Sequence, residues 1–169
     1  MLSRKRPELL DAGFTNLRAQ IDREETFKEM KAAGMTGHWL PHADQFNYQI
    51  IVVVDGNVVP DRLPTQMNGN SAIVKQLTER IEHWYSSLRH GENIILVKSD
   101  ISDLEETLER ELKNASRLAR IAKNGKLLVQ KVLSQRAVDC YWAELLEVYS
   151  SFLERPVAPP EDKNAFCNL

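Results

Sequence analysis

Charged and turn-forming residues follow a short apolar run near the middle of the chain, and they are the first candidates for chemistry. The run covers residues 50–54 and is rich in β-branched side chains, as in a strand that is buried on both faces. Asp55, Gly56 and Asn57 come directly after it and tolerate the positive φ angles of a turn. In open parallel sheets, ligands bind outside the carboxyl ends of the strands. We therefore expect binding or catalysis in the loop that follows Val54.

Arg62 lies toward the end of the same loop, next to Leu63-Pro64. The residues alone leave two interpretations of this arginine open. In the first, the loop is a binding site and Arg62 belongs to it. In the second, Arg62 is a solvated surface residue and Asp55-Gly56 is an ordinary turn.

Histidines and cysteines do not form a convincing metal site in the sequence. His38 and His42 are four residues apart, but Pro41 between them disfavours the helix that would align their side chains. We find no full set of ligands around these two histidines. Cys140 and Cys167 have the spacing of neither a disulfide framework nor a metal site. We therefore expect no metal ion.

Strand and helix patterns alternate along the chain, which predicts an α/β fold with a Rossmann-like, doubly wound parallel sheet and flanking helices. Only three convincing strands are present, so the sheet would leave an apolar edge open, and we expect the later part of a larger α/β domain. A helix start is predicted at Ser102, where Glu105 three residues later completes a capping box. Strands are expected at residues 50–54, 72–74 and 93–98, and helices at residues 79–88, 102–112, 115–133 and 137–153.

Composition divides the chain into three parts. Residues 1–47 are expected to form a connector or lid with one short helix that ends near Gly34, residues 48–153 an α/β domain, and residues 154–169 a disordered tail. The 22 basic and 24 acidic residues are interspersed and give a net charge of −2, which favours neither nucleic acid nor an anionic membrane as a partner. We recognise neither a signal peptide nor an apolar run long enough to span a membrane.

Short blocks along the chain are similar, in order, to the sequences of one enzyme family. They read L-S-R-K-R-P-E-L-L-D-A near the start, then D-G-N, R-L-P, N-S-A-I-V-K-Q, E-H-W-Y, I-L-V-K-S-D-I-S-D-L, I-A-K-N-G and C-Y-W-A-E-L-L-E-V-Y. Over residues 2–153 the chain thus resembles the carboxyl-terminal part of the Rumi-type protein O-glucosyltransferases. These enzymes belong to the capsule-associated-protein family, glycosyltransferase family 90.

The resemblance implies the carboxyl-terminal portion of a GT-B glycosyltransferase, in which residues 48–153 form part of the domain that binds the nucleotide sugar. It implies transfer of glucose or xylose from UDP-glucose or UDP-xylose to a serine of a protein acceptor such as an EGF-like repeat, in the lumen of the endoplasmic reticulum. It implies no metal or other cofactor. The family's proposed catalytic carboxylate precedes the matching region, so we expect no catalytic residue here and no activity from this chain alone.

The family's donor loop falls on the residues that follow the first predicted strand. Arg62 is the first choice for binding the diphosphate, because a guanidinium fork binds its oxygens bidentately and stays charged at any working pH. Ser71 and Lys75 flank the second strand and are weaker candidates, and Lys75 either faces phosphate or pairs with a carboxylate. The predicted donor-binding residues are Asp55, Gly56, Asn57, Val58, Val59, Pro60, Asp61, Arg62, Ser71 and Lys75.

Two other functions stay open from the sequence, an inactive remnant that binds a nucleotide or sugar and a helical interaction protein that has only inherited the fold. Trp84 and Tyr85 have the spacing of core residues and are expected to pack rather than to bind a ligand. Asn114 begins an N-x-S sequon, which matters only if the chain reaches the lumen.

Overall fold

A three-stranded parallel sheet lies at the centre of the protein, in a computed structural model that describes residues 2–15 and 22–153. The strands β1 (Ile50–Val53), β2 (Ala72–Gln76) and β3 (Ile95–Val97) have the order β1-β2-β3. Ile51 is in register with Ile73, and Val74 with Ile95. The first four residues of β2 are buried, as expected for a central strand covered on both faces. The prediction of a parallel α/β fold is thus confirmed.

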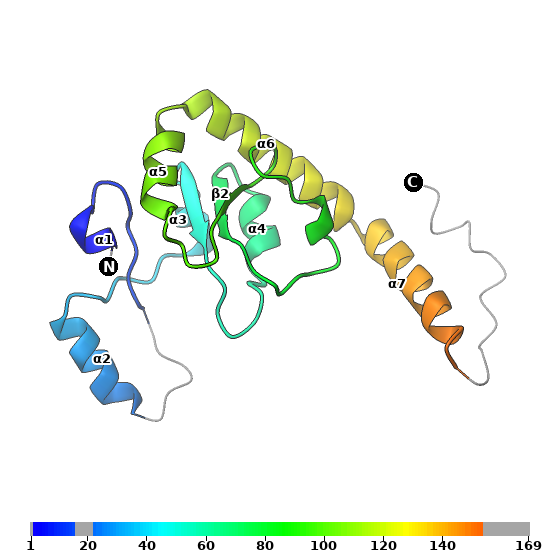
Figure 1. Cartoon of the computed structure of the whole chain (residues 1–169), viewed down its shortest axis with the longest axis horizontal. Coiled ribbons are helices and arrows are strands. Elements are labelled where there is room, and N and C mark those ends of the chain that lie inside the picture. The colour runs from blue at the N-terminus through cyan, green and yellow to red at the C-terminus, as the bar shows by residue number, and fades with distance from the viewer. Residues whose placement is uncertain (1, 16–21, 154–169) are drawn as a thin grey trace.

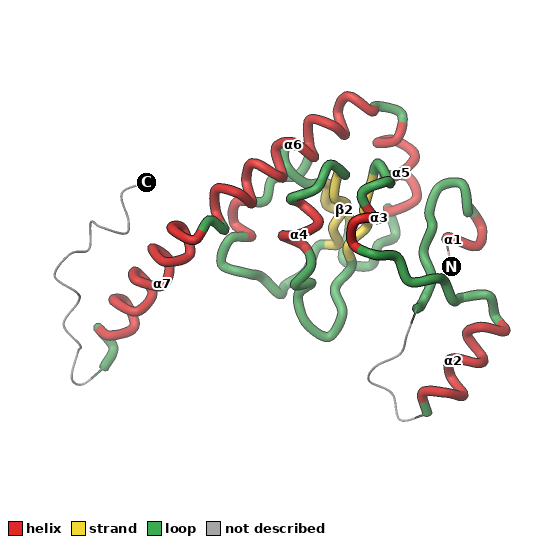
Figure 2. The backbone as a smooth tube through the Cα atoms, turned by 180° about the vertical axis from the view of Figure 1, so that it is seen from behind, coloured by secondary structure: helices red, strands yellow, loops and turns green. Residues whose placement is uncertain are grey.

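Helices cover both faces of this sheet, and successive strand residues point to opposite faces. On one face, Ile51 and Ile73 contact the core that contains α4 (Leu63–Met67) and the later part of α6 (Ala115–Val132). On the other face, Val74 packs with α5 (Leu104–Leu112) and the earlier part of α6. Seen from behind, the strands lie between α4 and α5 (Figure 2). The two cores hold the carboxyl ends of the strands in fixed positions.

At Gly125 the long helix α6 lies close against Asn93, which precedes β3, and Met67 of α4. A Cβ atom at this position would lie 2.8 Å from the carbonyl oxygen of Asn93 and 3.2 Å from the methyl group of Met67. The glycine therefore permits a close approach that alanine would obstruct. The helix begins after Asn114, whose side-chain oxygen accepts a hydrogen bond from the Arg117 N–H at 2.9 Å. The helix predicted at residues 115–133 is confirmed, with Gly125 inside it.

The remaining helices precede the sheet in the chain or follow α6, as the colours of Figure 1 show. Three short ones precede the sheet, α1 (Leu2–Lys5), α2 (Arg23–Ala32) and α3 (His42–Gln45), and α7 (Gln135–Ser150) projects beyond the end of α6. The helix expected to end near Gly34 corresponds to α2, and the one expected at residues 137–153 corresponds to α7. No helix within the described ranges is long and apolar enough to cross a membrane.

The prediction of a helix at residues 79–88 is wrong, because only a short 3₁₀ turn, η1 (Tyr85–Ser87), forms there. Ile81 and Trp84 were expected on one buried face, but Ile81 is 75% exposed whereas Trp84 is 4% exposed. The core position of Trp84 is confirmed. The segment between β2 and η1 is irregular and runs along the loop that follows β1, with consequences described below.

The capping box predicted at Ser102 is also wrong. The helix α5 begins at Leu104 with Asp103 at the N-cap, and no side chain caps it. The carboxylate of Asp103 instead accepts the Lys98 N–H at 2.9 Å, and Ile101 just before has a φ of 55°. The chain therefore turns more sharply after β3 than the capping pattern indicated.

The division of the chain at residues 47 and 153 stays a prediction. The tail predicted at residues 154–169, which includes Cys167, lies outside the described residues.

Candidate functional site

The loop of residues 55–62 follows Val54 at the carboxyl end of β1 and leads into α4. Its far end is fixed because Pro60 and Leu63 are buried and Leu63 is fully enclosed by the core. Asn57 and Val58 at its tip are exposed, as are Asp61 and Arg62. The loop therefore presents its main chain and one guanidinium at the edge of the sheet where parallel α/β proteins bind ligands.

Arg62 occupies the N-cap position of α4 with its side chain in solvent. One of its terminal nitrogens donates a long hydrogen bond of 3.4 Å to the carbonyl oxygen of Val54. No carboxylate in the described part of the chain forms an ion pair with it. Most of the guanidinium fork is therefore available to an anionic ligand.

A buried ion pair fixes the first residue of the loop. Lys75 in β2 approaches the Oδ1 atom of Asp55 with its Nζ at 3.1 Å, and the exposed side-chain fractions are 2% and 10%. The same Nζ donates to the Gln76 carbonyl oxygen at 3.0 Å, and the Asp55 N–H donates to Oε1 of Gln76 at 3.1 Å. Of the two arrangements open for Lys75, the structure therefore has the pairing with a carboxylate.

Burial and the neighbouring positive charges shift the pKa of Asp55 in opposite directions. Burial alone raises the pKa of the Asp55 carboxyl, but hydrogen bonds from Thr78 and Lys75 and the charges of Lys75 and Arg80 outweigh it, so the pKa is lowered. Tyr85 lies beneath, with its ring centroid 5.3 Å from the Lys75 Nζ. Burial, together with the charges of Glu82 and Asp55, raises the pKa of Tyr85 to about 12. At neutral pH the cluster thus holds an ionised Asp55 and a neutral phenol.

Arg80 also contacts the loop, and the sequence analysis did not single it out. Its Nη1 atom donates to the carbonyl oxygens of both Gly56 and Asn57, each at 2.8 Å. The segment that carries Arg80 follows β2, the strand next to β1 in the sheet. Because β2 is the neighbour of β1 in the parallel sheet, the residues that follow β2 lie next to the loop that follows β1.

Ser71 is not brought to the loop. It precedes β2, at the amino end of the sheet, and its hydroxyl donates to the Tyr48 carbonyl oxygen at 2.6 Å. The length of a strand of five residues, about 3.3 Å for each, separates it from the loop. Of the ten predicted residues, the structure gathers the eight of residues 55–62 with Lys75 and leaves Ser71 apart. Their role in binding a donor stays a prediction.

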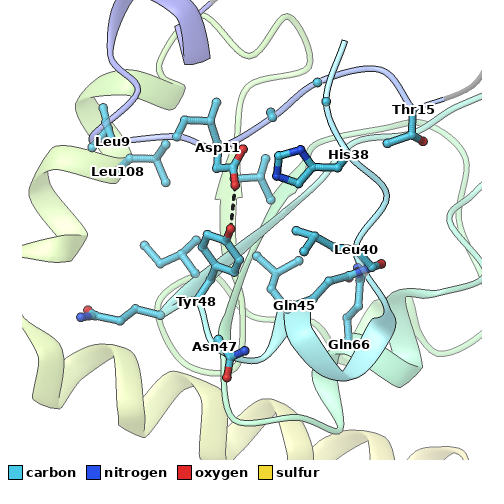
Figure 3. Close-up of a pocket in the computed structure, with 18 of the residues that line it drawn as sticks. Leu9, Asp11, Thr15, His38, Leu40, Gln45, Asn47, Tyr48, Gln66 and Leu108 are labelled. Carbon is cyan, nitrogen blue, oxygen red and sulfur yellow. Dashed lines mark hydrogen bonds between the residues drawn. The ribbon is translucent and has the colours of Figure 1, made fainter.

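An open cavity of about 970 Å³ lies on the amino-terminal side of the loop, between residues 8–15, residues 37–49 and β1 (Figure 3). The Tyr48 hydroxyl donates to Oδ2 of Asp11 at 2.6 Å across it, and this hydrogen bond is the main reason why the pKa of Tyr48 is raised. Arg62 and Gln66 also line the cavity, and the Gln66 Oε1 is buried without a hydrogen-bond partner. Arg62 therefore belongs to the loop and also lines the cavity.

His38 and His42 line this cavity too. Within residues 2–15 and 22–153, no group of three or more His, Cys, Asp or Glu side chains is placed to hold a metal ion.

The parallel sheet covered on both faces, with an arginine-bearing loop beyond the carboxyl end of a strand, defines an α/β protein of the Rossmann-like class. Comparison with known families makes the assignment specific. The family model described as "Glycosyl transferase family 90" matches residues 1–169. The chain therefore belongs to glycosyl transferase family 90, as the ordered blocks of its sequence predicted.

Curated relatives carry the name protein O-glucosyltransferase. Protein O-glucosyltransferase 3 of Rattus norvegicus is 34% identical over 160 residues, which cover 95% of this chain and 30% of the relative. The Homo sapiens protein of the same name is 32% identical over 175 residues, which cover 98% of this chain and 33% of the relative. Protein O-glucosyltransferase 1 of Rattus norvegicus is 30% identical over 162 residues, covering 96% and 40%. The chain thus spans 30 to 40% of the length of these relatives.

Proposed function

We propose that this chain is the donor-binding, carboxyl-terminal part of a GT-B protein O-glucosyltransferase. In this proposal the whole enzyme transfers glucose or xylose from UDP-glucose or UDP-xylose to a serine hydroxyl of a protein acceptor such as an EGF-like repeat, in the secretory pathway. Membership of glycosyl transferase family 90 supports the reaction class, and the names of the relatives support a protein acceptor. The observation that carries the proposal is the exposed guanidinium of Arg62, which forms no ion pair among the described residues, on a loop at the carboxyl edge of the sheet.

The role of the loop follows from the charge of the leaving group. When the sugar is transferred from a UDP-sugar, the leaving group is UDP. Negative charge grows on the diphosphate of UDP in the transition state, and fixed hydrogen-bond donors stabilise this charge. Arg62 supplies a permanent positive charge and a planar fork for two phosphate oxygens. Asn57 and Val58 are exposed residues of the same loop and carry main-chain N–H groups. In this arrangement residues 55–62 bind the donor by its diphosphate and leave the sugar free to meet the acceptor.

The general base of the reaction is not assigned to this loop. A base must accept the proton of the acceptor serine, and a carboxylate with a lowered pKa does so poorly. Asp55 has a lowered pKa and is already paired with Lys75. Asp61 is exposed next to Arg62, where a base would face the phosphates that should repel it. We therefore propose that the base lies outside these residues and that the 169-residue chain alone transfers no sugar.

Calorimetric titration of the 169-residue chain with UDP tests the donor site. Arg62→Lys keeps the charge but loses the planar fork, so binding should weaken by about 1 to 3 kcal/mol, the worth of a charge-assisted hydrogen bond. Arg62→Ala should bind more weakly still. Arg120→Ala, which removes an exposed arginine from α6 far from the loop, is the matched control and should bind as the wild type does. Equal affinities in all four proteins would exclude Arg62 from a UDP site.

A transfer assay with radiolabelled UDP-glucose and UDP-xylose and a folded EGF-like repeat tests the assignment of the base. The 169-residue chain should show no transfer, since loss of general-base catalysis alone costs about 10²- to 10⁴-fold. Robust transfer that Asp55→Asn or Asp61→Asn abolishes would show that the base lies in this loop.

A further inference from the structure

The guanidinium of Arg80 binds two consecutive carbonyl groups of the loop after β1. Its Nη1 atom lies 2.8 Å from the Gly56 oxygen and 2.8 Å from the Asn57 oxygen. A terminal guanidinium nitrogen carries two hydrogens, so each carbonyl receives its own. Arg80 stands in the irregular segment between β2 and η1, and its side chain is exposed. The contact therefore joins two loops at the surface and adds no residue to either core.

These two hydrogen bonds determine where the neighbouring N–H groups point. Within the described residues no peptide bond is cis, and in a trans peptide the carbonyl and the N–H point in opposite directions. The Gly56 carbonyl shares its peptide unit with the Asn57 N–H, and the Asn57 carbonyl shares its own with the Val58 N–H. Because both carbonyls face Arg80, both N–H groups face away from it. Neither N–H has a hydrogen-bond partner in the part of the chain that the structure describes.

The residue before these two peptide units is held as well. Asp55 is bound through its carboxylate by Lys75 and through its N–H by Gln76. The Gly56 N–H donates back to the Val58 carbonyl oxygen at 3.3 Å, which closes a tight turn. Residues of one short segment, 75–80, thus restrain the first three residues of the loop. Two adjacent free N–H groups on a restrained turn are the kind of main-chain donors that bind anions.

We propose that Arg80 is a positioning residue that orients the Asn57 and Val58 N–H groups toward the diphosphate of the nucleotide sugar. This inference rests on the proposed function, because it takes the ligand from there. Arg80 acts through the main chain, whereas Arg62 contacts the ligand with its own side chain. The N–H pair is in place before the ligand arrives, so binding loses little free energy to ordering of the loop.

The test compares the wild-type 169-residue chain with Arg80→Ala, Arg80→Lys and the matched control Arg120→Ala. Backbone ¹⁵N order parameters, measured without ligand, report whether the loop is held. In the wild type and the control, residues 56–58 should have values of about 0.85, typical of rigid backbone, and in Arg80→Ala they should fall toward about 0.6. Arg80→Lys should restore much of the order, because an ammonium can also donate to two carbonyls.

Titration with UDP then connects the order of the loop to binding. The amide protons of Asn57 and Val58 should shift downfield on addition of UDP in the wild type and much less in Arg80→Ala. The dissociation constant for UDP should rise about tenfold in Arg80→Ala, the worth of a charge-assisted hydrogen bond at an exposed site. The dissociation constant of Arg80→Ala divided by that of the wild type should be the same at 0.05 M and 0.5 M salt. Salt screens a simple charge attraction but does not screen the orientation of the main chain.

Several results would overturn the inference. Unchanged order parameters in Arg80→Ala would show that Arg80 does not hold the loop. UDP binding without a shift of the Asn57 and Val58 amides would show that these groups are not the donors. Equal dissociation constants for Arg80→Ala and the wild type at high salt would show that Arg80 acts only as a distant charge. If the wild type bound no UDP, the proposed function and the ligand named here would both fail, while the order parameters would still decide whether Arg80 positions the loop.

Discussion

The buried pair of Lys75 and Asp55 should be a large single contribution to the stability of the loop end of the sheet. Lys75→Met keeps the length of the side chain but removes the cation 3.1 Å from the Asp55 carboxylate. The two side chains are 2% and 10% exposed, so water cannot replace the lost partner, and Oδ2 of Asp55 already has no hydrogen bond to any of the residues that the structure describes. Breaking a buried pair in this way costs about 3 to 5 kcal/mol. We expect about 3 kcal/mol, because Thr78 and Arg80 still stabilise the carboxylate.

Urea unfolding followed by circular dichroism would measure this cost at pH 7. The comparison includes Asp55→Asn, the double variant Lys75→Met/Asp55→Asn and the matched control Lys123→Met, which removes an exposed lysine from α6. The double variant should regain at least half of the loss, because no uncompensated charge is left buried. The control should stay within about 0.5 kcal/mol of the wild type, as surface substitutions usually do.

The pH dependence of the free energy of unfolding gives a second check on the role of the Lys75–Asp55 pair. In the wild type the pKa of Asp55 is lowered, so its contribution to stability is present above the unfolded value of about 3.9 and is lost as the pH falls through the folded value. In Lys75→Met the burial that raises the pKa remains while a main opposing charge is gone, so the ionised carboxylate destabilises the fold near neutrality. The difference between the two proteins should therefore shrink as the pH falls from about 7 to about 4. A difference that is constant with pH, or smaller than about 0.5 kcal/mol at pH 7, would refute the reasoning.

Three further substitutions test packing and ion pairing elsewhere in the fold. Gly69→Ala should lower the free energy of unfolding by about 1 to 3 kcal/mol, because a Cβ there would overlap the Phe46 ring, whereas Gly56→Ala, with no atom within 4 Å of its Cβ, should change it little. Equal melting curves for the two variants would contradict this. Arg117→Ala removes the 2.8 Å partner of Glu111, whose side chain is 4% exposed, and should cost about 1 to 2 kcal/mol at pH 7 since Arg110 remains. Burial raises but Arg117 and Arg110 lower the pKa of Glu111, with a net lowering. The cost should therefore begin to shrink as the pH falls below the unfolded value of about 4.3 and disappear as it falls through the lowered folded value, which a series of urea titrations at decreasing pH would show.

The strands and the helix α6 were predictable because their local patterns coincide with burial, whereas the apolar face of α7 has the helical spacing but is largely exposed, for example at Val148 and Tyr149. The β-branched runs at residues 50–54 and 72–74 contain Val53 and Val74, which the structure buries completely, and a two-sided core requires such continuous apolar runs. The helices α6 and α7 follow from apolar residues at three- and four-residue spacing and begin at Asn114 and Ser134, both of which cap. Parallel pairing followed from the alternation of strand and helix. These features depend on residues close together in the sequence.

The segment at residues 79–88 was not predictable in this way, because distant contacts determine its path. Trp84 has the spacing of a helical core residue and is indeed buried, but Ile81 three residues earlier is exposed. Directly before Ile81, the chain is held by the hydrogen bonds of Arg80 to Gly56 and Asn57. A helical pattern cannot anticipate a hydrogen bond to a loop more than twenty residues earlier. The same reasoning explains why Arg80 was missed as a candidate residue.

The topology of the sheet explains why the support of the loop comes from this part of the sequence. In a parallel sheet the carboxyl ends of neighbouring strands lie side by side, so the residues that leave β2 are the nearest neighbours of those that leave β1. Val53 is in register with Lys75, which places Asp55 beside the first residues after β2. The contacts of the loop accordingly span 20 residues to Lys75, 21 to Gln76 and 24 from Gly56 to Arg80. In the donor site that we propose, the peptide planes that carry the Asn57 and Val58 N–H groups are fixed from outside the loop. The neighbouring strand end is the element that provides this support, and in this chain it contributes Lys75 and Gln76, with Arg80 a few residues beyond.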